Sequence, residues 1–303
     1  MSRFRLGPAD SRWPVGLSDL AALGGSPVVR CLWVEGELPE LPGVAVVGSR
    51  RASAAGLEVA RRVGADLGRR GVTVVSGFAR GVDAAAHRGC LRAGGRTVAV
   101  LGCGLDVDYP LQHRGLRAEV VAAGAMVSEH EPGEAPLAWH FPHRNRIIAA
   151  LCSAVVVVEA GVESGALSTA RWAADLGREV LAVPGSILSP ANLGSNRLLG
   201  DGAQPYLDVD DLADLFPVCA APPVSSRHRK VSLPPDGGSS SAIDHGGKPS
   251  RLLALVGAEP VHRELLGRAL GLGASELAIL LGEMELAGSI RSLPGGLVSR
   301  SRW

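Results

Sequence analysis

Residues 139–171 read WHFPHRNRIIAALCSAVVVVEAGVESGALSTAR, and the rest of the chain can be organised around this stretch. Its basic segment, Phe141 to Arg146, is expected to form a turn that opens an apolar helix. A buried strand is predicted at Ala154 to Val158, where apolar residues follow one another without a break. The strand leads into Glu159 and the small-residue loop Gly161 to Gly165, after which a second helix is expected. Guanidinium groups, a strand end and helix N-terminal amides would then meet at one place, which suits a string of phosphates.

Short apolar strands alternate with helical segments from residue 42 to about residue 216. Strands that are apolar along their whole length are typical of a parallel sheet covered on both faces. The predicted fold class is therefore α/β, with a Rossmann-like doubly wound, mostly parallel sheet. The predicted strands are Val44–Val47, Val72–Val75, Thr97–Leu101, Ala125–Val127, Ala154–Val158 and Glu179–Val183.

Almost every predicted strand ends in small or polar residues. In open parallel sheets, ligands bind outside the carboxyl ends of the strands. Small residues let backbone amides approach a ligand closely, and the helices that follow offer their N-termini to anions. Because the pattern recurs, we expect this edge of the sheet to be functional. The strand ends are GSR at 48–50, SG at 76–77, GCG at 102–104, SE at 128–129, EAG at 159–161 and PG at 184–185.

The composition outside the alternating region predicts three further parts of the chain. Residues 1–41 read as an N-terminal extension that packs on the Rossmann-like domain of residues 42–216. Residues 217–249 are rich in Pro, Gly and Ser, which indicates a flexible linker. Residues 250–303 show three helical patterns followed by a two-stranded wing at 290–298, and this is the pattern of a small C-terminal winged-helix domain.

The bulk composition excludes several function classes. The net charge of the 303 residues is +1, so any basic surface must be local. Lys230 and Lys248 are the only lysines, which argues against lysine chemistry in the folded parts. The five cysteines are scattered and odd in number, which favours a reducing compartment over a disulfide framework or zinc knuckle. With no signal peptide and no run of apolar residues long enough to span a bilayer, we expect a soluble, cytoplasmic protein without a membrane partner.

A series of motifs resembles the DNA-processing protein A family, also called DprA or Smf. The motifs occur in order and cover nearly all of the large domain, and a C-terminal winged helix is also found in many members. They are GSRRAS at 48–53, VSGFARGVDAAAHRGCL at 75–91, TVAVLGCGLDVDYP at 97–110, SEHEPGEAPLAWHFPHRNRIIAAL at 128–151, VVVVEAGVESGALSTA at 155–170 and VPGSILSPANLGSNRLLGDGA at 183–203.

The resemblance implies a protein that binds single-stranded DNA without strong sequence preference. It further implies a homodimer and an interaction with the RecA recombinase in natural transformation. We expect no enzymatic activity and no cofactor. Together with the strand-end pattern, the resemblance gives the candidate DNA-binding residues Gly48, Ser49, Arg50, Gly77, Ala79, Arg80, Gly81, Phe141, Arg144, Asn145, Arg146, Ser164, Gly165, Gly194, Ser195 and Asn196.

Several of these residues have a structural interpretation beside the functional one. Phe141 either stacks on bases, as aromatic platforms do in single-strand binders, or belongs to the core. Arg144 is expected to face DNA more than Arg146, whose alternative role is an ion pair with Glu159. Ser195 either completes the rim of the site or caps a short helix.

Two further clusters raise the question of chemistry. Asp83 and His87 lie four residues apart on a predicted helix, so they can face each other. A structural pair that holds the preceding loop is the favoured interpretation over a catalytic acid and base. His140 and His143, with Cys152 downstream, do not match a standard metal-ligand spacing, so no metal site is expected.

The alternative function is a nucleotide-binding or nucleotide-hydrolysing enzyme of the same superfamily, related to the phosphoribohydrolases. Those enzymes carry a PGGxGT loop where this chain reads VESGALSTA, which lowers the enzyme interpretation. Glu159 is the best candidate carboxylate if chemistry occurs.

In the winged helix, the third helical pattern at 274–287 carries three glutamates and no Lys or Arg. Because these charges repel phosphates, the domain is predicted to be a protein-contact or accessory module.

Overall fold

The computed structural model describes residues 3–24, 27–219, 252–253, 255–256, 261–293 and 296–300. The chain divides into two compact units, Met1–Arg227 and His228–Trp303, and each is described by itself. The predicted linker lies outside the described residues from residue 220 onward. The domain boundaries that the sequence predicts after residues 41, 216 and 249 are not tested by the structure.

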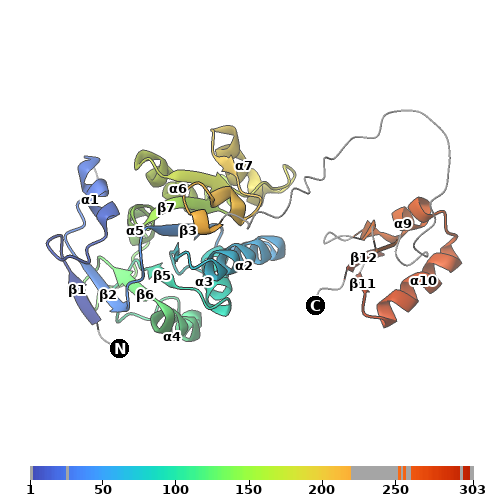
Figure 1. The fold of residues 1–303 in the computed structure, drawn as a ribbon, viewed down its shortest axis with the longest axis horizontal. Coiled ribbons are helices and arrows are strands. Elements are labelled where there is room, and N and C mark those ends of the chain that lie inside the picture. The colour runs from blue at the N-terminus through green and yellow to red at the C-terminus, as the bar shows by residue number, and fades with distance from the viewer. Residues whose placement is uncertain are drawn as a thin grey trace. The chain divides into compact units, whose positions relative to one another are not determined.

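The large unit is built on one nine-stranded sheet with the order β1-β2-β6-β5-β4-β3-β7-β8-β9 (Figure 1). From β6 to β9 all neighbouring strands are parallel, which confirms the predicted fold class. The parallel strands are β3 (Gly43–Val47), β4 (Val74–Ser76), β5 (Thr97–Val100), β6 (Ala125–Ser128), β7 (Cys152–Val157), β8 (Glu179–Ala182) and β9 (Gln204–Pro205).

The strand order reverses beside β3. The chain runs outward from β3 through β4 and β5 to β6, and then returns to the other side of β3 with β7. At such a switch point the loops after the two central strands turn to opposite faces and leave a crevice at the carboxyl edge. The crevice is therefore expected between the loops that follow β3 and β7.

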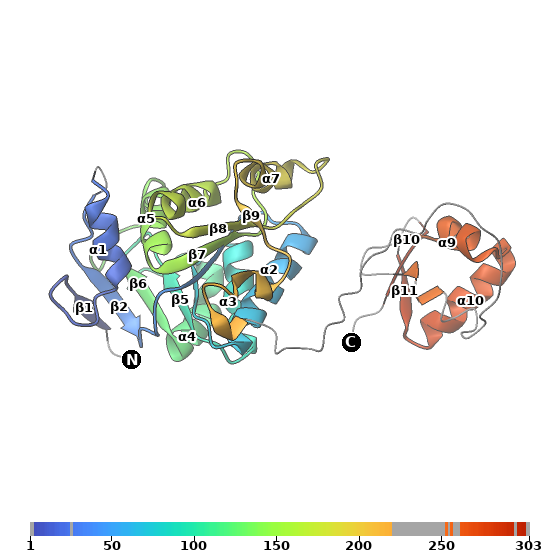
Figure 2. The ribbon, with the colours of Figure 1, turned by 45° about the horizontal axis from the view of Figure 1, so that its top comes forward.

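Helices cover both faces of the sheet (Figure 2). Helices α5 (His140–Ala150) and α6 (Ala166–Asp175) lie on one side of the strands, and α3 (Val82–Arg92) and α4 (Arg114–Ala123) lie on the other with α2 (Ala54–Arg69). Successive residues of β3 feed the two cores in turn, because side chains alternate along a strand. Val44 and Val46 pack with α2 and α3, whereas Ala45 and Val47 pack with α5 and α6.

The N-terminal residues complete one edge of the sheet. Strand β1 (Arg3–Leu6) pairs antiparallel with β2 (Leu32–Gly36), and β2 pairs antiparallel with β6. Helix α1 (Val15–Ala22) places Leu17 and Leu20 in the same core as α5. After β8, α7 (Leu193–Gly200) precedes the short edge strand β9.

The basic segment after Trp139 is helical rather than a turn, which corrects the expectation. Helix α5 begins at His140, so every residue from Phe141 to Arg146 lies on it. Pro142 is tolerated because it falls in the first turn, where its missing N–H has no helical partner to lose. Successive side chains on a helix point about 100° apart. Arg144 and Arg146 therefore project in different directions, and the segment cannot present all its cations to one ligand.

The small unit is described on its own. Strands β10 (Val261–His262), β11 (Ile290–Leu293) and β12 (Leu297–Arg300) form an antiparallel sheet in the order β10-β12-β11. Helices α9 (Arg263–Leu270) and α10 (Ala274–Leu286) contribute Leu266, Leu277 and Met284 to its core. The β11–β12 hairpin is the predicted wing. In the described part of the chain, none of the helices has the length and apolarity needed to cross a membrane.

Candidate nucleic-acid interface

A cavity of about 750 Å³ opens at the switch point of the sheet. The loop after β3 lines it with residues 48–51, and the loop after β7 lines it with Gly161 and residues 163–165. The outer face of α5 forms the third wall through Phe141, Arg144 and Asn145. The cavity therefore lies at the carboxyl edge of the sheet, at the switch point where the topology predicts a ligand crevice.

Glu159 holds the loop after β3 in place. Its carboxylate accepts a hydrogen bond from the Ser53 N–H at 3.0 Å and one from the Ser53 hydroxyl at 2.5 Å. The same hydroxyl oxygen accepts from the Gly56 N–H and so caps α2. The backbone oxygen of Glu159 accepts from Ser49 N–H at 2.7 Å. The Glu159 side chain is buried and does not pair with Arg146, and the contacts that it makes in this structure are those of a scaffold residue.

The loop after β4 is held by Asp83. Its carboxylate accepts hydrogen bonds from the N–H groups of Gly77 at 3.1 Å and Ala79 at 3.2 Å. Burial raises the pKa of this carboxyl, and Arg144 nearby opposes that shift. His87 turns away from Asp83 and shares a 2.7 Å hydrogen bond with the Thr97 hydroxyl. Asp83 therefore fixes the loop, as the structural interpretation requires, but the predicted contact with His87 is not made.

The backbone of this second loop is tightly constrained. Phe78 has a φ of 58° and is buried, although residues other than glycine are uncommon in this left-handed region. Gly81 has a φ of 82°, and a Cβ there would collide with the backbone oxygen of Ser49. Only glycine satisfies both conditions. The loops after β3 and β4 are thereby packed against each other, which places Arg50 and Arg80 on the same edge.

Arg144 is a buried structural cation instead of an exposed arm. Its Nη1 donates to the backbone oxygen of Gly77 at 2.6 Å and to that of Val100, and its Nε donates to the Asn145 side chain at 3.1 Å. Burial lowers the Arg144 pKa to about 10, so it stays charged at neutral pH. Its Nη2 donates to no described residue, and Arg144 lines the cavity. One nitrogen of a rigidly held guanidinium is thus left for a ligand.

Arg146 is not available to DNA in this structure, which corrects its place among the candidates. Its guanidinium forms a bidentate ion pair with Glu129, at 2.7 and 2.6 Å, and its side chain is 1% exposed. It also donates to the backbone oxygen of His143 at 3.0 Å. A fully buried arginine needs such a partner, because an unpaired charge costs several kcal/mol to desolvate.

Asn145 ties α5 to the loop before α6. Its Nδ2 donates to the Gly165 backbone oxygen at 3.0 Å and to the Ser168 hydroxyl at 2.7 Å. Ser164 and Gly165 line the cavity, and the Gly165 N–H donates to no described residue. This amide precedes α6, where the helix dipole favours an anion.

Gly194, Ser195 and Asn196 do not line the cavity, contrary to expectation. Gly194 and Ser195 donate their N–H groups to the Ala160 backbone oxygen, and the buried Ser195 hydroxyl donates to Asn192. Asn196 exchanges two hydrogen bonds with the Gly185 backbone. These residues brace the rim from behind. Ser195 is the third residue of α7, so it does not cap that helix.

An aromatic row extends the site beyond the main cavity. The Arg50 guanidinium lies 5.0 Å from the centre of the Phe141 ring, and the Tyr109 ring lies 5.3 Å from the same ring. Arg50, Phe141 and Arg144 also line a narrow slot of about 40 Å³ that Tyr109 closes. Phe141 is thus half-buried between the two hollows. Tyr109 was not among the predicted site residues, although it lies in the motif TVAVLGCGLDVDYP at 97–110, shortly after a strand end.

The charges on the rim are unequal. Arg50, Arg51 and Arg80 are exposed, and none of them forms an ion pair with a described residue. Glu163 lines the opposite side of the main cavity. Since like charges repel, a polyanion is expected to follow the arginine side and the aromatic row.

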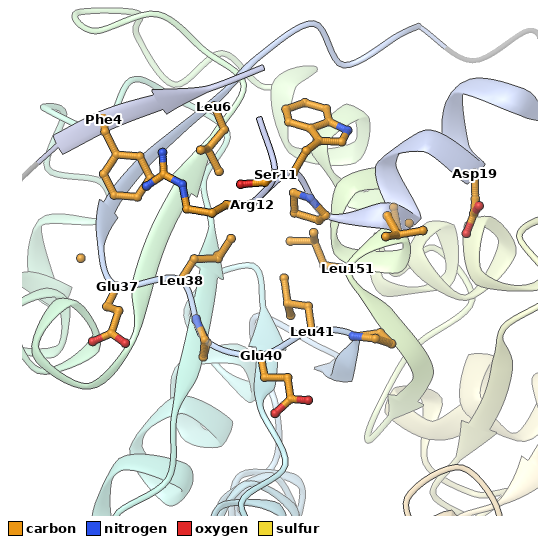
Figure 3. A pocket seen from close by; sticks show the side chains of 18 of the residues that line it. Phe4, Leu6, Ser11, Arg12, Asp19, Glu37, Leu38, Glu40, Leu41 and Leu151 are labelled. Atoms are coloured by element: carbon orange, nitrogen blue, oxygen red, sulfur yellow. The ribbon is translucent and has the colours of Figure 1, made fainter. Parts of the chain in front are cut away.

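A second hollow of about 710 Å³ lies at the opposite, amino-terminal edge of the sheet. Figure 3 shows Leu38, Leu41 and Leu151 around it, with Arg12 beside the Phe4 ring. The Arg12 guanidinium lies 4.7 Å from the centre of that ring, but it is already paired with Asp10. This hollow lacks the unpaired cations of the carboxyl edge.

The fold and the site define a Rossmann-like α/β protein whose ligand edge carries unpaired arginines beside an aromatic row, in a chain that also contains a winged-helix unit. The chain belongs to the family of DNA recombination-mediator protein A, whose family model matches residues 5–217. The DprA winged helix domain matches residues 239–296. Both matches confirm the resemblance drawn from the motifs.

Known relatives agree with this assignment. A DNA processing protein DprA from Mycobacterium tuberculosis is 44% identical over 219 residues, which cover 68% of this chain and 56% of that protein. The chain thus spans about half the length of that relative. The X-ray structure of DNA processing protein A from Streptococcus pneumoniae is 38% identical, with a TM-score of 0.65 over 71% of this chain and 74% of that one. The Helicobacter pylori structure, described for its single-stranded DNA binding mode, is 26% identical, with a TM-score of 0.62 over 71% of this chain and 95% of that one.

Proposed function

We propose that this protein binds single-stranded DNA along the carboxyl edge of its sheet, without strong sequence preference. The observation that carries the proposal is the row formed by Arg50, Phe141 and Tyr109. Arg50 and Phe141 line both the main cavity and the narrow slot, and Tyr109 extends the row along the slot. Single strands are held by positive grooves combined with aromatic platforms, because every base has a face that can stack. The H. pylori relative described for its single-stranded DNA binding mode supports the proposal.

The proposed biological role is to protect incoming DNA and load RecA on it during natural transformation, with the protein acting as a homodimer in the cytoplasm. The family description as a recombination mediator supports this role. It is tested by whether the protein stimulates RecA filament formation on single-stranded DNA. Failure to do so, with DNA binding intact, would restrict the role to binding.

The site is proposed to bind and not to react. The two buried carboxylates near the cavity, Glu159 and Asp83, are both engaged by N–H or O–H donors of the scaffold. These bonds position the loops after β3 and β4, which supports a structural role for both carboxylates. If the protein hydrolyses a mononucleotide and Glu159→Gln abolishes turnover, the enzyme alternative replaces this one.

The test is the affinity of rim variants for a fluorescent poly-dT oligomer. Arg50→Ala and Arg80→Ala should each weaken binding several-fold, and each should reduce the slope of log K against log salt by about 0.7, the value for one lost phosphate contact to a single strand. Arg62→Ala is the matched control, because Arg62 is an exposed arginine on α2 outside the cavity. Wild-type affinity in the Arg50→Ala, Arg80→Ala double variant would show that the site is misplaced.

A further inference from the structure

Three residues with metal-ligating side chains meet where the segment after β6 joins the first turn of α5. They are His130, Glu134 and His140, and one ligand atom from each lies within 4.8 Å of the other two. His130 Nδ1 is 2.7 Å from Glu134 Oε1, and His140 Nε2 is 3.4 Å from the same oxygen. The two imidazole rings stack with their centres 4.0 Å apart.

The histidines carry nitrogen atoms that the protein leaves unused. His140 Nδ1 lies 3.2 Å from the Gly102 backbone oxygen, which can only accept, so Nδ1 holds the proton of the neutral ring. The lone pair is then on His140 Nε2, which is buried and has no hydrogen-bond partner among the described residues. Ligand histidines in metal sites are commonly oriented by such a bond from the other ring nitrogen, as His140 is by Gly102. The ligand atom of His130 is Nδ1, which faces Glu134 Oε1, and with zinc bound the proton of the neutral ring is on the buried Nε2.

The carboxylate is held in position by its own loop. Glu134 Oε2 accepts from the Glu131 N–H at 3.3 Å, and the Glu134 backbone oxygen accepts from the Gly104 N–H at 2.9 Å. Between them, Gly133 has a φ of 85° and donates its N–H to Asp106 at 2.6 Å. The turn that presents Oε1 to the two rings is therefore formed before any ligand arrives.

We propose that His130, Glu134 and His140 form a zinc site. Two imidazoles and one carboxylate with an open fourth position are an established Zn²⁺ ligand set, whereas Mg²⁺ and Ca²⁺ prefer oxygen ligands alone. Tetrahedral bonds of about 2.0–2.2 Å place ligand atoms about 3.3 Å apart. The 3.4 Å separation already fits this geometry, and the 2.7 Å contact opens by about 0.6 Å when zinc replaces its proton.

Neighbouring groups delimit the site. Glu129 is neutralised by Arg146, so it is not a competing ligand, and Cys152 lies in β7 outside the cluster. The Glu134 side chain is 39% exposed, which gives the ion a way in. The ion would fasten the segment to the first turn of α5, next to Phe141. Zinc would thus stiffen one wall of the proposed DNA groove without touching the DNA.

Zinc content of the full-length chain tests the proposal. The protein is stripped with EDTA, dialysed against ZnCl₂ and then against buffer, and its zinc is counted by mass spectrometry. Glu134→Gln keeps the size of a half-exposed side chain and one of its two acceptor oxygens, but it removes the ligand charge. The matched control is Glu131→Gln, an exposed carboxylate three residues earlier and outside the cluster.

One zinc ion per chain is expected for wild type and Glu131→Gln, with Glu134→Gln binding at least 10-fold more weakly, since even loss of an outer-shell partner costs metal sites about 10–100-fold. Thermal unfolding gives a second measure: ZnCl₂ should raise the midpoint of wild type and control only, and MgCl₂ should raise none. Equal midpoints of the EDTA-treated proteins confirm that the variant is folded. Equal zinc in all three proteins, or loss in both variants, overturns the proposal.

Discussion

Arg144 and Arg146 are two positions apart, yet they meet different neighbours. Arg144 reaches the ends of β4 and β5, where carbonyl groups hold it, whereas Arg146 reaches the opposite side of α5 and meets Glu129. The cations left for a ligand are then mostly outside the basic segment, at Arg50 and Arg80. The sequence predicts four arginines as DNA contacts, Arg50, Arg80, Arg144 and Arg146. The folded environment of each arginine determines whether its guanidinium is free or already paired.

The aromatic row should contribute base stacking. Phe141→Leu and Tyr109→Leu keep apolar volume but remove the ring, so each should weaken poly-dT binding, by up to the ~1–3 kcal/mol of one stacked base. Fluorescence anisotropy measures the change. Phe4→Leu is the matched control, because Phe4 also lies under an arginine but at the opposite edge of the sheet (Figure 3). A loss of affinity in the control equal to that in Phe141→Leu would contradict the prediction.

His87 should make the fold sensitive to acid. Burial lowers its pKa from 6.5 to about 3, so below pH 6.5 the unfolded chain binds a proton that the folded chain does not. The stability due to neutral His87 is complete above that pH and is lost as the pH falls toward 3, with a slope of up to about 1.4 kcal/mol per pH unit. Denaturant unfolding from pH 7 to 4 should show a shallower decline in His87→Asn, which keeps a donor for Thr97. Parallel pH profiles would exclude His87 as the cause.

At the scale of elements, the site is assembled by loops that hold one another. Glu159 at the end of β7 fixes the N-terminus of α2, and Asp83 in the first turn of α3 fixes the loop after β4. Rigid loops lower the cost of ordering a site when the ligand binds. Strand ends and helix starts thus share the positioning of Arg50 and Arg80.

Gly77 should be intolerant of a side chain. A Cβ there would collide with the Arg144 guanidinium and lie 2.8 Å from Asp83 Oδ2, both of which are buried and hydrogen-bonded. Gly77→Ala should therefore reduce the free energy of unfolding by about 1–3 kcal/mol, as overpacking does, and weaken DNA binding. Gly115→Ala is the control, because Gly115 lies in α4 with open space around it and should gain up to about 1 kcal/mol. Unchanged stability of Gly77→Ala would mean that Arg144 can move.

At the scale of the molecule, the ligand edge of the large unit and helix α10 of the small unit differ in their charges, although the wing of the small unit also exposes Arg291 and Arg300. The exposed arginines of the ligand edge belong to the large unit, whereas α10 of the small unit carries Glu276, Glu283 and Glu285. Acidic residues on the helix that enters a DNA groove in other winged helices would repel phosphates. The accessory role predicted for this unit is consistent with that charge.

Removal of the small unit should leave single-strand binding intact. A chain that ends at Arg227 keeps all the rim arginines and the aromatic row, so its affinity for poly-dT should stay within about twofold of the full-length value, a difference of under ~0.5 kcal/mol. Its binding to duplex DNA should be equally unaffected. A large loss of duplex binding on truncation would assign that activity to the winged helix.

The sequence alone predicted the layers, the parallel strands and the ligand edge. These features follow from short-range patterns: apolar runs mark buried strands, and small residues at their ends mark the carboxyl edge. The same patterns placed Arg50, Gly77 and Arg80 in loops where the structure also finds them. Such signals are local, so no long-range information is needed to read them.

The tertiary structure decided which of the candidate side chains are free. The start of α5 at His140 set the directions of Arg144 and Arg146. Distant partners then define their surroundings: Glu129 pairs with Arg146, Tyr109 lies beside Phe141, and Glu134 contacts His130 and His140. The positions at which strands end and loops begin can be predicted from the sequence, because they depend on neighbouring residues. Which charges are buried in ion pairs and which remain for a ligand depends on neighbours that only the folded chain brings together.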